Sequence, residues 1–508
     1  MTVAVKPTDR IEYGDFQTPE TLAARVMEVI VRKGVKYRTA IEPTCGVGNI
    51  LYAAADHLPG IQSALGIEIN PVYAAHALAR QSAVPVQVET ANFFNLDLAA
   101  LTHSLPQPYI FVGNPPWVTS AAIGQLGGRN LPQKTNAAGL SGLDALTGKS
   151  NFDISEWIMR RMLEIVAGTD NACAMLIKSS VARKVIAYAA KTGLAVKNFE
   201  LYSIDAAREF GVSVSACLFF FRGASSAGTM SYDYTTYDNL EGKSPTQNFY
   251  IDGYFVTDHQ SYRETQKYSM STRGEWRSGI KHDAAKVMEL RCLDNNLITA
   301  TGDTLDIESD LVYPFLKSSD IAKGNLIPRL YTIVTQHFIG EDTNFIKKTY
   351  PHTWSYLEQH RQVFDMRKSS IYRGKPTFSI FGVGDYSFAP YKIAISGLYK
   401  TLHFTLLEPL DGKPVMVDDT CYILSFFDRI AALIHLCAFQ HPVSGNFFRS
   451  RIQWDEKRPV KKDILDSFDV ISFIRDYKEE IAITAQQYGV TRSEFDFWYS
   501  RQLPDRLF

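Results

Sequence analysis

The chain before Gly223 alternates short apolar segments with helical ones, and this alternation limits the folds that it can adopt. The segment 39–49 has the pattern of a buried strand that enters a glycine-containing turn, and an alanine-rich helix follows. A second strand is predicted over 64–69, after which Asn70 and Pro71 provide good N-cap and first-turn residues for another helix. Such alternation predicts an α/β fold with a doubly wound, mostly parallel sheet, whose ligand sites gather at the carboxyl ends of the strands.

A segment rich in Gly, Ala and Ser, 223–229, follows the last strand of this pattern and has the composition of a flexible linker. We therefore expect two domains, residues 1–225 and residues 226–508, the second a mixed α+β domain. Of the 508 residues, 45% are hydrophobic and 21% are charged, so the chain can bury two sizeable cores and is not disordered.

The glycine-containing turn has features of a ligand site. Gly46 and Gly48 let the backbone approach a ligand closely, and Glu42 precedes them at the end of the strand. A carboxylate there suits a positively charged ligand better than a pyrophosphate, and the full dinucleotide pattern G-x-G-x-x-G is absent. Glu68, which ends the next strand, suits the paired hydroxyls of a ribose. These residues favour S-adenosylmethionine over NAD, although an ordinary strand-to-helix turn also accounts for the two glycines alone.

The tetrapeptide Asn114-Pro115-Pro116-Trp117 follows a predicted strand, the apolar run 109–112. An amino group conjugated to an aromatic ring is a poor nucleophile until both of its N–H bonds are accepted. The Asn114 side-chain oxygen and a diproline carbonyl can accept those two bonds, and the Trp117 face can stack on the ring. The tetrapeptide thus predicts a site for a flat, amino-bearing ring. A Pro-Pro pair is equally typical of a plain loop.

The order of these motifs resembles that of the amino-group DNA methyltransferases of the gamma motif order, which belong to restriction-modification systems. In that family the cofactor motifs come first, the catalytic tetrapeptide next and the target-recognition region last. Residues 16–20 (Phe-Gln-Thr-Pro-Glu) are similar to the family's N-terminal cofactor motif, with Thr18 capping and Pro19 opening a helix. The resemblance implies that residues 1–225 form the catalytic domain and residues 226–508 the DNA target-recognition domain.

The resemblance also assigns cofactor contacts. The loop 42–48 is similar to the family's methionine-binding loop, and Glu68 is similar to its ribose-binding acid. Asn92 and Phe93 stand where the family has Asp and an aromatic residue against the cofactor adenine; the Asn is a departure, yet its oxygen can still accept from the adenine amino group. The implied S-adenosyl-L-methionine-binding residues are Thr18, Pro19, Glu42, Pro43, Gly46, Gly48, Glu68, Ile69, Asn92, Phe93 and Asn114.

Phe210 is a candidate for stacking on the substrate base. The sequence Glu209-Phe210-Gly211 and the apolar run 212–221 look like the family's late strand motif, in which an aromatic residue packs on an extruded base. Phenylalanine as core filler is an equally good interpretation. The polar segment 120–149, directly after the tetrapeptide, is expected to be a loop that moves until substrate arrives.

The net charge of −1 gives no sign of a nucleic-acid partner, but the charge is unevenly distributed. Between Asp320 and Lys400 basic residues exceed acidic ones by about five and are interleaved with aromatic ones, a pattern suited to gripping phosphates and touching base edges. A merely solvated basic face remains an alternative. The segment 313–317 and the pair Asp320-Ile321 look like a segment of the family's recognition regions. The DNA-binding candidates are Lys317, Arg367, Lys368, Arg373 and Lys375.

Cysteine usage and hydropathy indicate a cytoplasmic protein. Six cysteines are scattered without a C-x-x-C or Cys/His pairing, which argues against a metal site or a disulfide framework. The N-terminal segment 1–10 has no apolar core for secretion. The apolar stretch 421–439 is interrupted by Asp428, Arg429 and His435, so we predict a buried amphipathic helix and no contact with a membrane.

The function implied by the resemblance is methyl transfer from S-adenosyl-L-methionine to the N6 atom of an adenine flipped out of double-stranded DNA, alongside a separately encoded restriction endonuclease. Asn114 favours adenine, because family members specific for cytosine N4 more often begin the motif with serine. Cytosine N4 methylation and a catalytically silent DNA-recognition subunit remain alternatives. Ribosomal-RNA adenine and protein-glutamine methyltransferases share the motif but are usually smaller.

Overall fold

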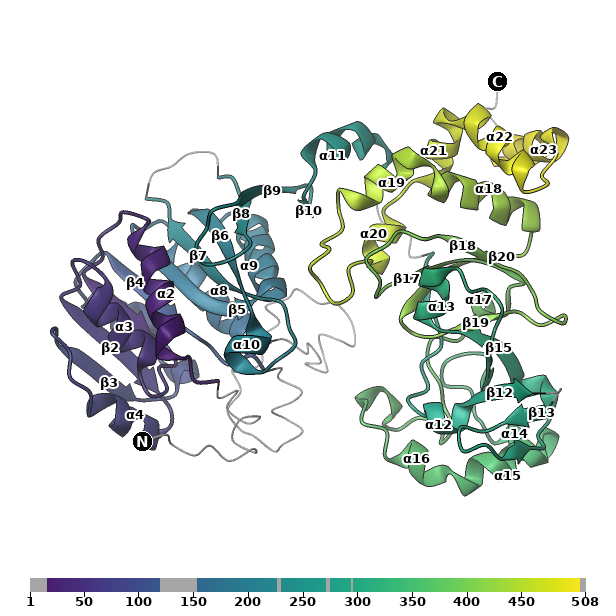
Figure 1. The fold of residues 1–508 in the computed structure, drawn as a ribbon, viewed down its shortest axis with the longest axis horizontal. Coiled ribbons are helices and arrows are strands. Elements are labelled where there is room, and N and C mark those ends of the chain that lie inside the picture. Colours follow the sequence, from purple (N-terminus) through teal and green to yellow (C-terminus); the bar gives the residue numbers. More distant parts are fainter. Residues whose placement is uncertain (1–15, 119–152, 226–229, 271–274, 294–295, 503–508) are drawn as a thin grey trace. The chain divides into compact units, whose positions relative to one another are not determined.

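The computed structural model describes residues 16–118, 153–225, 230–270, 275–293 and 296–502. The chain divides into two units between Thr257 and Asp258 (Figure 1). The boundary expected at residue 225 falls inside the first unit, because the strands after the glycine-rich segment continue the sheet of that unit by pairing from β6 outward. These added strands are β8 (Tyr234–Tyr237), β9 (Pro245–Ile251) and β10 (Tyr254–Val256).

The first unit is built on a ten-stranded sheet with the order β3-β2-β1-β4-β5-β7-β6-β8-β9-β10. The strands from β3 to β5 are parallel, and β7 runs antiparallel to both of its neighbours. The expected doubly wound α/β sheet is therefore confirmed. Its strands before β8 are β1 (Thr39–Glu42), β2 (Ser63–Glu68), β3 (Val86–Thr90), β4 (Tyr109–Gly113), β5 (Ala172–Lys178), β6 (Val196–Ile204) and β7 (Ala216–Gly223).

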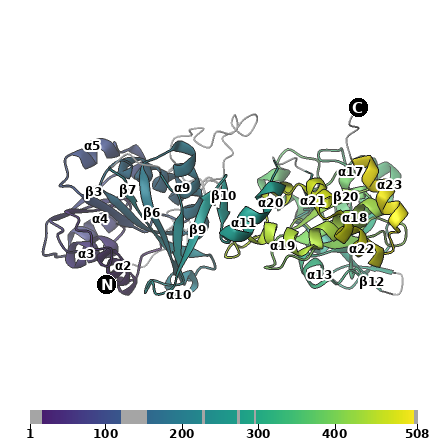
Figure 2. The ribbon, with the colours of Figure 1, turned by 90° about the horizontal axis from the view of Figure 1, so that it is seen from above.

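Helices cover both faces of this sheet, which explains why β1 and β4 are buried along their whole length. Figure 2 shows α2 and α3 on one side and α5 and α9 on the other. The α8 helix buries one stripe of side chains at helical spacing, including Ile154, Ile158 and Met162. The helices are α2 (Glu20–Val31), α3 (Asn49–His57), α4 (Pro71–Leu78), α5 (Leu98–His103), α8 (Ile154–Val166), α9 (Ser179–Thr192) and α10 (Ala206–Phe210), with the short 3₁₀ helix η1 (Phe93–Asn95).

The second unit contains two sheets and is the mixed α+β domain that was expected. One sheet has the order β14-β13-β12-β16-β15-β19 and the other β11-β20-β17-β18. The strands are β11 (Arg277–Ser278), β12 (Glu289–Leu293), β13 (Asn296–Ile298), β14 (Thr304–Leu305), β15 (Val312–Leu316), β16 (Leu330–Ile333), β17 (Tyr391–Ser396), β18 (Thr405–Leu407), β19 (Met416–Val417) and β20 (Cys421–Phe426).

The helices of the second unit are short in its middle and pack together at its C-terminal end, where α18 contacts α21, α22 and α23. They are α11 (His259–Thr265), α12 (Ala285–Met288), α13 (Ser318–Lys323), α14 (Phe345–Thr349), α15 (Pro351–Gln359), α16 (Arg361–Asp365), α17 (Asp385–Phe388), α18 (Arg429–Gln440), α19 (Pro442–Arg449), α20 (Lys462–Asp466), α21 (Val470–Asp476), α22 (Lys478–Gln487) and α23 (Arg492–Gln502), with 3₁₀ turns η2 (Gln266–Tyr268), η3 (Ser309–Leu311) and η4 (Ser370–Tyr372).

The prediction of one helix over 421–439 is wrong. Its first part is the strand β20, which pairs with β17, and the helix α18 begins only at Arg429. Asp428 breaks the apolar run as an N-cap, since its side chain accepts the backbone N–H groups of Ile430 and Ala431. Among the residues that the structure describes, no helix is long and apolar enough to cross a membrane.

Candidate cofactor and catalytic site

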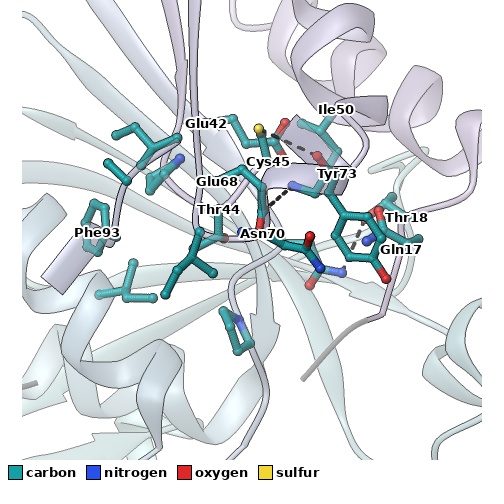
Figure 3. A pocket seen from close by; sticks show the side chains of 18 of the residues that line it. Gln17, Thr18, Glu42, Thr44, Cys45, Ile50, Glu68, Asn70, Tyr73 and Phe93 are labelled. Atoms are coloured by element: carbon teal, nitrogen blue, oxygen red, sulfur yellow. Dashed lines mark hydrogen bonds between the residues drawn. The ribbon is translucent and has the colours of Figure 1, made fainter. Parts of the chain in front are cut away.

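A cavity opens at the carboxyl ends of β1, β2 and β4, where a doubly wound sheet binds its ligands. It measures about 880 Å³, counting the space at its open mouth. Tyr73, Gln17 and Thr18 gather at one end and Phe93 lies at the other (Figure 3). The predicted cofactor-binding residues that line it are Thr18, Glu42, Pro43, Gly46, Glu68, Ile69, Asn92, Phe93 and Asn114.

Two predicted residues, Pro19 and Gly48, are outside this lining. Pro19 is the N-cap of α2, and Gly48 is the N-cap of α3. Both Gly46 and Gly48 have positive φ, at 54° and 84°, a conformation that side chains disfavour. A Cβ at Gly46 would lie 2.7 Å from the Gln17 side-chain oxygen. Gly46 therefore borders the cavity closely, while Gly48 shapes the turn behind it.

Glu68 connects the glycine loop to the end of β2. Its two carboxylate oxygens accept the backbone N–H of Gly46 at 2.7 Å and of Asn70 at 2.8 Å. A carboxylate can accept about four hydrogen bonds, so these two do not by themselves conflict with a contact to a ligand hydroxyl. A contact between Glu68 and a cofactor ribose is compatible with this geometry and stays a prediction.

The cavity is acidic. Among the described residues that line it, Glu42 and Glu68 carry carboxylates and none is Lys, Arg or His. Burial raises the pKa of the Glu42 carboxyl well above its ordinary value; the Leu51 backbone amide opposes this shift and Glu68 adds to it. A lining with two acidic and no basic side chains suits a cation better than a pyrophosphate, which fits a sulfonium cofactor.

The tetrapeptide begins directly after β4, and Asn114 is held by the N-terminal segment. Its amide Nδ2 donates to the Phe16 carbonyl at 2.9 Å and to the Thr18 hydroxyl at 3.2 Å. Its Oδ1 is buried and has no hydrogen-bond partner within the described ranges. Because buried acceptors are normally paired, this oxygen is placed to receive a donor from a bound substrate.

Thr18 was expected to cap the following helix, and that expectation is wrong. The α2 helix begins at Glu20 with Pro19 as its N-cap, and no side chain caps it. The Thr18 hydroxyl instead contacts the catalytic candidate Asn114, far along the chain. A local Thr-Pro-Glu pattern suggests a cap, and only the tertiary fold shows this contact.

The last three residues of the tetrapeptide differ in whether they line the cavity. Pro116 lines the cavity, whereas Pro115 and Trp117 do not. The Trp117 indole is 6% exposed and donates to the Leu176 carbonyl at 3.0 Å. Its ring lies 5.2 Å from that of Phe210, edge to face. Phe210 ends α10, is partly buried and packs against the same core, so both stacking assignments stay predictions.

The side-chain oxygen of Asn92 accepts a hydrogen bond from the backbone close by in the sequence. Asn92 Oδ1 accepts the backbone N–H of Phe94 at 3.0 Å and caps η1. The oxygen expected to accept from the cofactor adenine is therefore already engaged, although an amide oxygen has a second lone pair. Phe93 is 5% exposed and its ring packs edge to face on Trp157, which gives the cavity an apolar end.

Lys178 is a residue that the sequence did not single out. Its Nζ donates to the Trp117 carbonyl at 2.9 Å and forms an ion pair with Asp153 at 2.6 Å. Asp153 in turn caps α8 by accepting the backbone N–H of Ser155. Lys178 thus holds the end of the tetrapeptide against β5 and α8. In the sequence, the feature that could have pointed to Lys178 is its position as the charged residue that ends an otherwise apolar strand.

The DNA-binding candidates in the second unit fall into two groups. Lys317 forms an ion pair with Glu289. Arg367 donates to four backbone carbonyls and lies 3.6 Å from the centre of the Tyr372 ring, so its donors serve the fold. The remaining candidates are exposed basic side chains: Lys368, Arg373 and Lys375.

The doubly wound sheet and the acidic cavity fit the class of S-adenosylmethionine-dependent methyltransferases. No family model matches the chain. It is 40% identical to the Type II methyltransferase M.NspV of Nostoc sp. (strain ATCC 29411 / PCC 7524) over 470 residues, which covers 91% of this chain and 97% of that protein. The chain therefore belongs to the Type II methyltransferases, and it is a DNA methyltransferase with S-adenosyl-L-methionine as its cofactor.

Two solved structures resemble the chain at low sequence identity. The Type IIL restriction-modification enzyme MmeI, solved in complex with DNA, has a TM-score of 0.57 and 13% identity, covering 99% of this chain and 75% of MmeI. The type IIG restriction endonuclease BpuSI has a TM-score of 0.37 and 12% identity, covering 93% of this chain and 62% of that one. The likeness to MmeI shows that the two chains share a fold.

Proposed function

We propose that the chain transfers a methyl group to the exocyclic N6 of an adenine that is turned out of double-stranded DNA. The observation that carries this proposal is the unpaired Asn114 Oδ1 beside the acidic cavity. An acceptor held in this position suits an amino group, because the amide nitrogen is already committed to Phe16 and Thr18. The proposed adenine specificity rests on Asn114 as the first residue of the tetrapeptide.

The residues of the chain act by positioning and by hydrogen bonding. When bound, S-adenosyl-L-methionine supplies an electrophilic methyl group. Asn114 Oδ1 and the Pro115 carbonyl accept the two N–H bonds of the target amine and direct its lone pair toward that methyl. With the cofactor bound, Glu42 would face its positive end, Glu68 its ribose and Phe93 its adenine ring.

An aromatic cluster supports the extruded base. Extrusion of a base from a duplex costs a few kcal/mol. Phe16, Trp117 and Phe210 have ring centres 5.2 to 6.3 Å apart next to Asn114. Of the three, Phe210 and Phe16 are only partly buried, and stacking of the base on this cluster offsets part of the cost of extrusion.

We further propose that the second unit recognises the DNA target. The exposed side chains of Lys368, Arg373 and Lys375 provide charge for phosphate contacts. The complex of MmeI with DNA supports this role, since MmeI shares the fold over nearly the whole of this chain. A separately encoded restriction endonuclease of the same specificity is the partner expected for such an enzyme.

The test is to incubate the purified protein with S-adenosyl-L-methionine and unmodified DNA, and to identify the modified nucleoside by mass spectrometry. We expect N6-methyladenine within one sequence context. N4-methylcytosine would contradict the adenine assignment, and DNA binding without methylation would favour a silent recognition subunit.

The role of Asn114 is tested by Asn114→Ala. Removal of the acceptor should lower turnover at least 100-fold, on the order of the loss of one preorganised transition-state hydrogen bond. Affinity for S-adenosyl-L-methionine, measured by calorimetry, should change little, because Gly46, Glu68 and Phe93 remain. Methylation at the wild-type rate by Asn114→Ala would remove the assigned role.

A further inference from the structure

Glu42 is an acid that forms no ion pair with any residue that the structure describes. It ends β1, is 2% exposed, and its Oε2 has no hydrogen-bond partner among the described residues. The neighbouring strand β4 packs closely against it, since a Cβ at Gly113 would lie 3.3 Å from the Glu42 Cγ. An unpaired carboxylate in such surroundings is costly, and protonation is the usual response.

The groups that face Glu42 do not compensate a negative charge. From β2 comes Glu68, and from the glycine loop comes Cys45, whose thiol pKa burial and both carboxylates raise. From α3 comes the Leu51 backbone amide, the one favourable group among the influences on Glu42. Among the described residues that face Glu42 none is a cation, so a positively charged ligand in the cavity would be the counter-ion of an ionised Glu42.

We propose that Glu42 is protonated in the free protein and gives up its proton when the cofactor binds, so that cofactor binding releases a proton. The O–H bond of the carboxyl breaks, the proton passes to the buffer, and the carboxylate becomes the counter-ion of a cationic group on the cofactor. S-adenosyl-L-methionine carries two such groups, the sulfonium and the α-ammonium.

Calorimetry tests the proposal. Binding of S-adenosyl-L-methionine is measured near pH 7 in two buffers that differ in ionisation enthalpy, which gives the number of protons released. We expect up to one proton per cofactor. Because the complex holds one proton fewer, affinity should rise with pH by up to about tenfold per unit and level off above the pKa of Glu42 in the free protein. Binding without proton release would overturn the proposal and leave the cofactor assignment intact.

Glu42→Gln identifies the source of the proton. The amide has the shape of a neutral carboxyl, so the fold should persist, and thermal melting checks this. We expect no proton release, and affinity that no longer rises with pH. Glu89→Gln, which changes an exposed acid on β3, is the matched control and should release protons as the wild type does. Full release from Glu42→Gln would assign the proton elsewhere and contradict the proposal.

S-adenosylhomocysteine distinguishes the two cationic groups, because it lacks the sulfonium and keeps the α-ammonium. Proton release with both ligands supports the proposal with the α-ammonium as the partner of Glu42. Proton release with S-adenosyl-L-methionine but not with S-adenosylhomocysteine supports the proposal with the sulfonium as the partner of Glu42. In that case the preference of the wild type for S-adenosyl-L-methionine over S-adenosylhomocysteine should grow as the pH rises.

Discussion

The hydroxyl of Thr18 accepts one of the two hydrogen bonds that hold the Asn114 amide. Its loss in Thr18→Val should let the amide rotate and lower turnover by about tenfold, equivalent to about 1.4 kcal/mol, as expected for one hydrogen bond. Cofactor affinity should change less than turnover. Steady-state kinetics with calorimetry of cofactor binding measures both quantities.

Thr18→Ser is the control for this prediction, since it keeps the hydroxyl and should keep most of the activity. Wild-type turnover in Thr18→Val, or a loss of cofactor affinity as large as the loss of turnover, would contradict a positioning role.

Single residues also show where the sequence could not predict a contact. The pattern of residues 42–48 predicted Glu42 and Gly46, which line the cavity, and Gly48, which shapes the turn behind it, because those needs are local. Arg367 was a DNA-binding candidate on composition alone, yet its donors contact backbone carbonyls from four different positions. Whether an arginine side chain binds a phosphate or the backbone of its own domain depends on its neighbours in the tertiary structure, which the sequence alone does not reveal.

At the scale of elements, Lys178 at the end of β5 connects the tetrapeptide to the start of α8. Lys178→Met leaves the Asp153 carboxylate buried without its cation and should destabilise the fold by about 3 kcal/mol, the lower end for breaking a buried ion pair. Turnover should fall more than cofactor affinity, because the Trp117 carbonyl also loses its donor. Chemical denaturation and kinetics measure the two effects.

Lys184→Met is the matched control. Lys184 pairs with Glu156, whose side chain is 8% exposed, but Lys184 itself is 55% exposed and Glu156 keeps a second cation in Arg160. The substitution should change stability by less than 1 kcal/mol, because the carboxylate stays paired and the exposed lysine is screened by solvent. Equal losses of stability and turnover in the two variants would show that the Lys178 ion pair contributes no more than the Lys184 ion pair, and would contradict the prediction.

The strands of the first unit were predictable where both faces of the sheet are covered, because β4 and β5 are largely apolar runs and β1 is buried along its whole length. The strands β8 to β10 were missed, since they follow a segment with linker composition and the first three residues of β9 are exposed. The run 421–439 is apolar in both its strand and its helix, so hydrophobicity alone could not separate them.

At the scale of the whole molecule, the cofactor cavity and the exposed basic side chains belong to different units of the chain. The triple variant Lys368→Ala, Arg373→Ala and Lys375→Ala should weaken DNA binding and reduce the slope of log K against log salt by up to about 2.7, at about 0.9 for each phosphate contact. Cofactor binding should not change. Fluorescence anisotropy over a salt series measures the slope.

A matched triple variant removes the same charge from exposed positions of the first unit: Lys36→Ala, Lys191→Ala and Lys197→Ala. It should leave the salt dependence close to that of the wild type. Equal changes in both triple variants would indicate a general effect of net charge and no specific DNA-binding surface.

The acidic lining of the cavity has a practical consequence for handling the protein. If its ligand provides the missing positive charge, acid lowers the affinity of the complex and mild alkali preserves it. Preparations purified above neutrality should carry cofactor from the host cells, whereas dialysis at mildly acidic pH should strip it and yield material suitable for titration.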